Sequence, residues 1–280
     1  MQRLAPQLDR IMTDDTLEGV VVRRVGADPW SALRRFTDAR IALGRAGASL
    51  PTAALLAFNL SHAQARDAVH KPLDTEALKR ELDSRMLDSI EVCSAAQCRE
   101  QYLRRPDLGR VLDAQSADQL ARRVASSVSR PDLVLVIADG LSSSAAAFHA
   151  IPLIDRTIEQ LKGWDVGPIV VATQARVAIG DHIGELMHTG MVAVLIGERP
   201  GLSSPASLGV YITYRPAVGR SDAERNCISN VRPEGLGYDA AAFKLTHLLE
   251  AARSRKLTGI GLKDESAWHA DALPGVDGAQ

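Results

Sequence analysis

Aromatic residues, cysteine and a surplus of either charge are all scarce in this sequence. Aromatic side chains make up 4% of its 280 residues, so aliphatic side chains and alanine must fill most of the core. The 33 lysines and arginines nearly balance the 34 aspartates and glutamates. This balance gives no electrostatic reason to expect nucleic acid or an anionic membrane as a partner. No apolar run reaches the length of a membrane span.

The cysteines and histidines do not predict a metal site. Three cysteines are too few for a disulfide framework and fit a reducing cytosol. Cys93 and Cys98 lack a second pair to complete a zinc site, so we expect a helical pair whose thiols act as small apolar groups. His62 and His70 lie about two helical turns apart, but no further ligands follow at a recognisable spacing. Their segment is expected to end a helix or to form a protein interface.

The first 27 residues lack the apolar core and the cleavage site of a secretory signal, which favours a cytoplasmic location. Leu4, Leu8 and Ile11 have helical spacing. The segment is therefore either a weakly amphipathic helix or, as we favour, a mobile tail.

The strongest structural signal is the stretch from Pro131 to Ile154. Leu133–Ala138 is a continuous apolar run, typical of a parallel strand that is buried on both faces. Asp139 and Gly140 break this strand, and the serines at 142–144 follow where a helix start needs caps. This order predicts the first βα unit of an α/β domain, in which ligands bind at the carboxyl ends of the strands.

Further apolar runs predict more strands at 168–173, 191–196 and 208–214. A last helix is predicted over residues 239–256, after a long loop, and Ile260–Leu262 is expected to add a short edge strand.

The residues before the first strand have helical patterns instead, at 28–70, 73–103 and 116–128, the last with S-A-D-Q as its cap. Asp28 is expected to cap the first pattern, which Gly44, Gly47 and Pro51 interrupt before a helix restarts at Thr52. We therefore predict an α/β fold, a Rossmann-like parallel-sheet domain preceded by a mainly helical region. The predicted parts are an N-terminal tail (1–27), a helical region for subunit contacts (28–120) and the α/β domain (121–280).

Common nucleotide and hydrolase motifs are absent from the sequence. The turn after the first strand has a single glycine where a dinucleotide fold has G-x-G-x-x-G, and no G-x-x-x-x-G-K-[ST] occurs. Ser142–Ser144 lacks the second glycine of the α/β-hydrolase elbow. The serine turn is either a plain N-cap or a site for an anion or a polar ligand.

Two polar loops are the other candidates. Gly197–Gly201 follows the third predicted strand, and Glu198 is expected either to accept hydrogen bonds from a ligand or to pair with Arg199. In the second loop, Cys227 lies near Arg225, which would lower the pKa of its thiol, but no histidine is near in sequence to act as a base.

Five long stretches of the chain carry a resemblance to a known family. They are ARIALGRAGASLPT at 39–52, HAQARDAVH at 62–70, PDLVLVIADGLSSSA at 131–145, GERPGLSSPASLGVYITYRP at 197–216 and SDAERNCISNVRPEGLGYDAAAFKL at 221–245. Together they resemble the small (light) subunit of ethanolamine ammonia-lyase, and the resemblance covers about residues 30–265.

The resemblance implies a lyase that converts ethanolamine to acetaldehyde and ammonia with adenosylcobalamin. It implies a large catalytic subunit as partner, an assembly of six large and six small chains, and association with the ethanolamine-utilising bacterial microcompartment. It also implies three cobalamin contacts: Val177 would pack on the corrin or its base, Glu198 would accept hydrogen bonds from corrin amides, and Cys227 would make contact through its backbone or thiol.

No catalytic residue and no metal ligand is expected on this chain. Asp181 and His182 only superficially match the D-x-H-x-x-G motif of domains that supply a histidine to cobalt. The cobalt is therefore expected to keep its own dimethylbenzimidazole base. The alternative hypothesis is a stand-alone α/β hydrolase-type enzyme that uses Cys227 or the Ser142–Ser144 turn as nucleophile.

Overall fold

The computed structural model describes residues 28–37, 39–125, 130–204 and 206–266. They belong to two compact units, one that ends at Leu60 and one that begins at Ser61. The predicted N-terminal tail and the tail from Ala267 lie outside the described residues.

None of the residues described in the first unit (28–37 and 39–60) is buried. The 3-10 helix η1 (Pro29–Phe36) begins at Asp28, whose Oδ1 accepts a hydrogen bond from the Trp30 N–H at 2.9 Å, as the sequence predicts. Helix α1 (Thr52–His70) begins in this unit, and none of its 19 residues is buried. The large apolar side chains of the unit are exposed, including Trp30 (66%), Phe36 (72%), Leu56 (62%) and Leu60 (61%).

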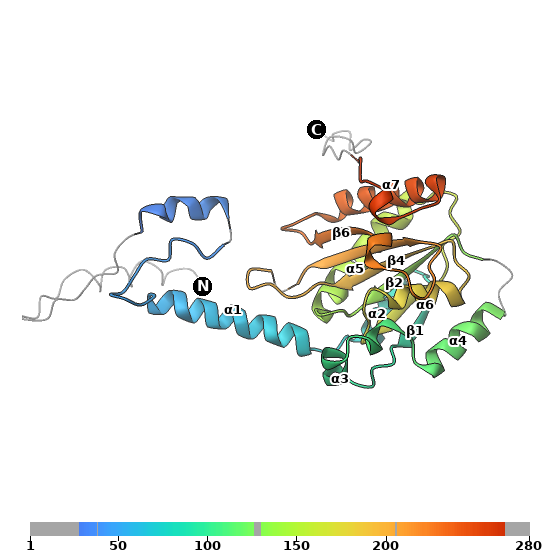
Figure 1. Cartoon of the computed structure of the whole chain (residues 1–280), viewed down its shortest axis with the longest axis horizontal. Helices are drawn as coiled ribbons and strands as arrows, with labels where there is room; N and C mark the ends of the chain where they lie inside the picture. The colour runs from blue at the N-terminus through green and yellow to red at the C-terminus, as the bar shows by residue number, and fades with distance from the viewer. Residues whose placement is uncertain (1–27, 38, 126–129, 205, 267–280) are drawn as a thin grey trace, which may run out of the picture. The chain divides into compact units, whose positions relative to one another are not determined.

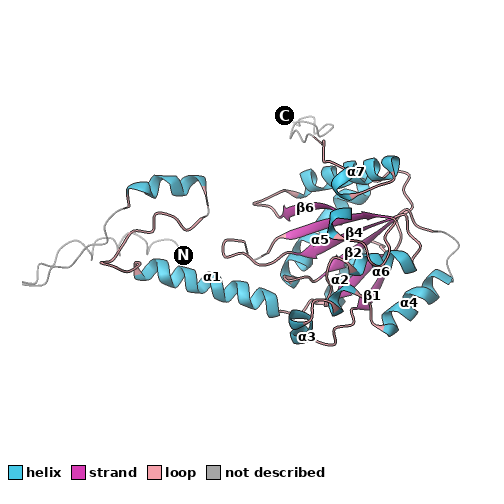
Figure 2. Ribbon diagram, viewed as in Figure 1, coloured by secondary structure: helices cyan, strands magenta, loops and turns pink. Residues whose placement is uncertain are grey.

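The second unit is an α/β structure built on a six-stranded mixed sheet (Figures 1 and 2). Its strand order is β1-β3-β2-β4-β5-β6; the first four strands are parallel, and β5 and β6 each run antiparallel to the preceding strand. The strands are β1 (Ser89–Cys93), β2 (Leu133–Ala138), β3 (Ile169–Thr173), β4 (Met191–Gly197), β5 (Leu208–Tyr214) and β6 (Asn226–Val231). The predicted α/β class is confirmed, with a sheet that is parallel over four strands.

Helices cover both faces of this sheet. They are α2 (Thr75–Ser84), α3 (Arg99–Arg104), α4 (Ala114–Ala125), α5 (Ser143–Gln160), α6 (Ile179–Leu186) and α7 (Tyr238–Arg255), with the 3-10 turns η2 (Leu108–Arg110), η3 (Asp222–Glu224) and η4 (Gly259–Gly261). None of the helices in the described ranges combines the length and the apolar content that a bilayer crossing requires.

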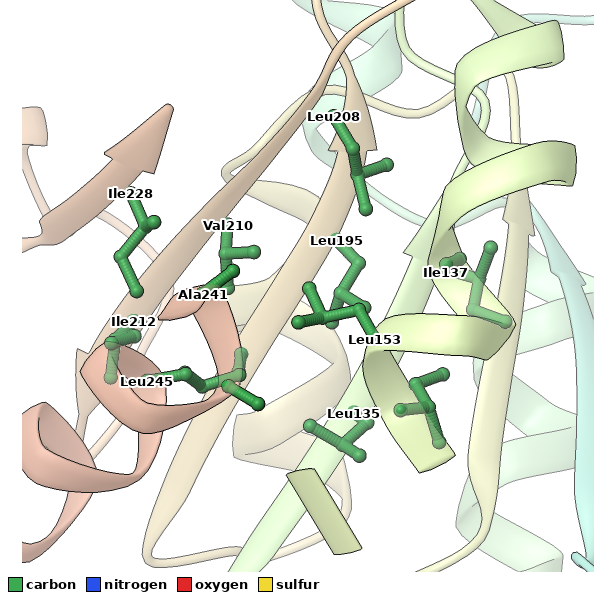
Figure 3. Packing of buried hydrophobic residues seen from close by; sticks show 14 of the residues in the cluster. Leu135, Ile137, Leu153, Leu195, Leu208, Val210, Ile212, Ile228, Ala241 and Leu245 are labelled. Atoms are coloured by element: carbon green, nitrogen blue, oxygen red, sulfur yellow. The ribbon is translucent and has the colours of Figure 1, made fainter. Parts of the chain in front are cut away.

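Strand β2 shows why two layers of helices are needed. All six of its residues are buried. Leu133, Leu135 and Ile137 join the core beneath α5 and α7, whereas Val134, Val136 and Ala138 join the core beneath α4 and α6. Figure 3 shows the first of these cores, where Leu135 and Ile137 lie with Leu153 of α5 and Leu195 of β4. Each leucine, isoleucine or valine side chain of this strand stabilises the fold by roughly 1.5–3 kcal/mol on burial.

Four predictions about individual elements were wrong. Residues 89–93 form the edge strand β1 instead of part of a helix, and Asn226–Val231 forms β6 where we predicted a loop. Residues 259–261 form the 3-10 turn η4 instead of an edge strand. Helix α4 begins at Ala114, and Asp113 caps it by accepting a hydrogen bond from the Ser116 N–H, so Ser116 is not the cap.

His149 of α5 links this helix to α7. Its Nδ1 lies 2.8 Å from the Tyr238 hydroxyl, and 9% of the residue is exposed. Burial lowers the pKa of His149 from its ordinary value of 6.5. The unfolded chain therefore binds the proton more readily than the folded chain does, so this site removes stability as the pH falls below 6.5.

We expect the His149→Gln variant to lose less stability than the wild type between pH 7 and pH 5, because glutamine does not titrate. Thermal unfolding of the full chain across this range measures the difference. His247→Gln, on α7 but outside the contact with Tyr238, is the control and should follow the wild-type curve. Parallel curves for wild type and His149→Gln would contradict the prediction.

Candidate functional site

The carboxyl ends of β2, β3 and β4 meet at one edge of the sheet. After β2 the chain forms β3 on one side of this strand and then crosses to form β4 on its other side. Open α/β sheets form a ligand crevice at the carboxyl ends of the strands where the strand order reverses in this way. A cavity of about 390 Å³ lies there. It is lined by Tyr102, Gly140, Leu141, Arg176, Val177, Ile196, Gly197, Glu198, Arg199 and Tyr211.

A buried carboxylate organises this edge. Asp139, directly after β2, is 2% exposed. Its oxygens accept hydrogen bonds from the backbone N–H groups of Gln174 and Ala175 at 2.9 Å and from Arg99 Nη1 at 3.0 Å. Burial raises the pKa of Asp139, whereas Arg99 and the two amides lower it. The network ties β2 to the turn after β3, where Gln174 has a left-handed backbone (φ 55°).

Two glycines allow the ends of β2 and β4 to approach closely. A Cβ at Gly140, where φ is +54°, would lie 2.1 Å from the Gly197 carbonyl oxygen. A Cβ at Gly197 would lie 2.0 Å from the Ser142 carbonyl oxygen. Side chains do not fit at either position, so the backbone itself forms this wall of the cavity.

Val177 and Glu198 both line the cavity, although they come from different strand ends. Val177 follows β3 and packs against the core beneath α6. Glu198 follows β4 and does not pair with Arg199: its carboxylate accepts hydrogen bonds from the Ser207 hydroxyl at 2.7 Å and, more weakly, from the Asn230 N–H at 3.3 Å. The structure thus brings two of the three sequence-predicted residues to one site.

Cys227 lies beside this site, on β6, and does not line the cavity. Its register partner on β5 is Tyr211, which does line the cavity. The thiol is exposed, and its Sγ lies 3.3 Å from the Ser229 hydroxyl. Burial, the Cys227 thiol and Glu198 all raise the pKa of Tyr211, so this phenol stays protonated.

Our sequence reasoning missed Tyr211 and Tyr102. Tyr211 belongs to an apolar strand pattern, and only its register with Cys227 shows that it faces the site. Tyr102 is fully buried, and its hydroxyl donates a hydrogen bond to the Ala175 carbonyl at 3.0 Å. Tyr102 lies within a charged helical pattern of the sequence. Nothing in that pattern indicates that its side chain is buried or that it lines a cavity.

Arg225, which lies near Cys227 in the sequence, is buried in an ion pair with Asp181. Its Nη1 and Nη2 lie 2.6 and 2.7 Å from the two Asp181 oxygens, and both side chains are 2% exposed. Burial by itself lowers the pKa of Arg225, but the Asp181 carboxylate outweighs burial and the pKa is raised. This pair joins α6 to the start of β6, next to Cys227.

The hydrolase alternative gains no support from the geometry. Ser142 is buried and caps α5 by accepting a hydrogen bond from the Ala145 N–H, and Ser143 is buried with its hydroxyl bonded to the Lys71 carbonyl. The plain N-cap interpretation is therefore confirmed for Ser142. Cys227 contacts Ser229 and has no histidine among the partners seen in the described ranges.

The described residues contain no group of three or more His, Cys, Asp or Glu residues arranged for a metal ion. Cys93 lies on β1 and Cys98 precedes α3; both are exposed, so they are not a helical pair and do not act as apolar core groups. His182 Nδ1 accepts a hydrogen bond from the Leu112 N–H at 3.1 Å, which gives this histidine a structural partner.

Comparison with known proteins identifies the family. The sequence profile of the ethanolamine ammonia-lyase light chain (EutC) matches residues 27–263. The chain belongs to this family. It is 56% identical over 241 residues to the ethanolamine ammonia-lyase small subunit of Azotobacter vinelandii, covering 85% of this chain and 89% of that protein. The small subunit of Ralstonia nicotianae is 55% identical over 86% of this chain and 90% of its own length.

We expect Asp181→Asn to destabilise the fold by roughly 3–5 kcal/mol, because it leaves the Arg225 guanidinium buried without its counter-charge. Urea unfolding of the full chain measures this loss. Asp107→Asn removes a carboxylate from the exposed pair with Arg105 and should leave the unfolding midpoint unchanged. Equal midpoints for the two variants would show that the buried pair does not brace the structure.

Proposed function

We propose that this chain is the small subunit of adenosylcobalamin-dependent ethanolamine ammonia-lyase, which converts ethanolamine to acetaldehyde and ammonia. In this proposal the chain holds part of the cobalamin at its interface with the large catalytic subunit and has no catalytic residue of its own. The supporting observation is that Val177 and Glu198, two contacts that the family resemblance implies, line one cavity at the carboxyl edge of the sheet.

The residues of this cavity fit one side of a cobalamin. Leu141, Val177 and Ile196 offer apolar surface for a corrin or benzimidazole ring. The Glu198 carboxylate is a hydrogen-bond acceptor that suits corrin amide groups, and Ser207 and Asn230 hold it in place. Cys227 remains a proposed contact, reached across Tyr211.

The cofactor would supply homolytic cleavage of its cobalt–carbon bond, and this chain would supply binding and orientation. Glu198 would fix the rotation of the corrin through its amides, while the backbone wall at Gly140 and Gly197 would set how closely the ring approaches the sheet. The protonated Tyr211 would present a hydroxyl without adding negative charge to the site.

Docking to the large subunit is proposed for the first unit. Residues 28–60 expose several large apolar side chains on η1 and α1, and an accumulation of such side chains is typical of an interaction site. The relatives' name, small subunit, supports a larger partner chain. An assembly of six large and six small chains, located in the cytoplasm beside the ethanolamine-utilising microcompartment, is the form that the family resemblance implies.

We expect a large complex after co-expression with the cognate large subunit, and ammonia release from ethanolamine only when both chains and adenosylcobalamin are present. Leu56→Asp, in the exposed part of α1, should weaken this complex in gel filtration because it places a charge in the proposed interface. Ile260→Asp changes a side chain that is 86% exposed on η4 and should leave assembly intact. Ammonia release by the pure small chain, at the rate of the full enzyme, would contradict the proposal.

We expect Glu198→Gln to weaken cobalamin binding by the assembled complex roughly tenfold or more, since a charge-assisted hydrogen bond is replaced by a neutral one. Equilibrium dialysis with cyanocobalamin measures binding without turnover. Glu159→Gln, at an exposed carboxylate on α5, is the matched control. An unchanged dissociation constant for Glu198→Gln would remove this residue from the proposed site.

A further inference from the structure

Arg176 is a half-buried cation that forms no ion pair within the described part of the chain. It lies three residues after β3, and none of the ion pairs formed between described residues includes it. Its Nε is buried and has no hydrogen-bond partner within the described part of the chain. Folding has removed this guanidinium from some of its water without giving it a protein acceptor in return. An external anion that accepts hydrogen bonds from the guanidinium would offset this cost.

The position of the Arg176 side chain is set in advance. Its backbone N–H donates to the Gly109 carbonyl at 2.7 Å, and its guanidinium carbon lies 4.4 Å from the centre of the Tyr102 ring. A Cβ at Gly109 would lie 2.9 Å from the Tyr102 ring and 3.0 Å from Arg176 Cγ, so only glycine leaves room for this stack. Little side-chain freedom remains to be lost when a ligand binds.

Arg176 also lies where two cavities meet. With Val177 and Tyr211 it lines both the cavity described above and a second cavity of about 340 Å³. Arg110 and Arg220 line the second cavity, opposed by the carboxylate of Asp222, and so does Ala178, the N-cap of α6. Arg220 is paired with Glu224, so Arg110, Arg176 and the positive end of the α6 dipole are the groups that favour an anion here.

We infer that Arg176 binds a phosphodiester, and, on the proposed function, that this is the phosphate of the cobalamin nucleotide tail. The phosphodiester is the anionic group on the periphery of cobalamin, whose other side chains are neutral amides. A guanidinium matches two phosphate oxygens at once, which an ammonium does not. Val177 would then contact the ring system while its neighbour Arg176 holds the tail, so the tail base would be bound by this chain.

The test compares cyanocobalamin with dicyanocobinamide, which keeps the corrin but lacks the phosphate, ribose and base. Binding is measured by equilibrium dialysis on the assembled complex, for wild type, Arg176→Met, Arg176→Lys and the control Arg104→Met, whose side chain is 77% exposed on α3. Circular dichroism and gel filtration establish that each variant folds and assembles.

We expect Arg176→Met to weaken cyanocobalamin binding by about 10- to 100-fold and to leave dicyanocobinamide binding unchanged. Arg176→Lys keeps the positive charge but not the paired N–H donors of the guanidinium, so its affinity for cyanocobalamin should lie between those of wild type and Arg176→Met. The control Arg104→Met should bind as tightly as wild type. Wild-type affinity for cyanocobalamin, but not for dicyanocobinamide, should also decrease as salt is raised.

Two results would overturn the inference while the proposed function stands. One is an unchanged cyanocobalamin affinity in Arg176→Met. The other is an equal loss for both ligands, which would mean that Arg176 only shapes the cavity. If the wild-type complex binds neither ligand, the proposed cofactor itself fails, and that outcome is distinct from both.

Discussion

The buried carboxylate of Asp139 is the contact on which the site depends. It stands at the end of the central strand β2 and accepts hydrogen bonds from two consecutive backbone N–H groups after β3 and from Arg99 of α3. Because the two backbone donors and Arg99 come from two separate parts of the chain, one carboxylate after β2 fixes where β2, β3 and α3 meet. The position of Arg176 and Val177 follows, since they continue directly from the turn that Asp139 holds.

The ion pair between Asp181 and Arg225 has the corresponding role on the other side of the site. Only two residues of strand β6 are buried, so apolar packing alone holds it weakly. The bidentate contact anchors its start to α6, and the adjoining Cys227 then faces Tyr211 in register. Buried charges of this kind add little net stability but specify one arrangement, because any other arrangement leaves a charge unpaired.

The two units of the chain differ in how their apolar residues are used. The α/β unit places them in two cores on either side of the sheet, whereas residues 28–60 keep theirs exposed. A chain that exposes leucine, phenylalanine and tryptophan together is suited to being completed by a partner. On the proposed function, the α/β unit would supply the cofactor-facing surface and the first unit the docking surface.

The sequence by itself determined the elements with strong local signals: β2, β3, β4 and β5 from continuous apolar runs, the Asp28 and Ser142 caps, and the helices α1, α5 and α7. It also determined the family, through long matching stretches that include Glu198 and Cys227. Strands β1 and β6 were not predictable, because edge strands have mixed polarity and form only by pairing with distant partners. Only the tertiary structure decided that Asp139 and Arg225 are buried braces, that Tyr102 and Tyr211 line the cavity, and that Arg176 keeps an unsatisfied nitrogen there. These properties depend on which strand ends become neighbours, and strand order is a long-range outcome that local sequence patterns do not encode.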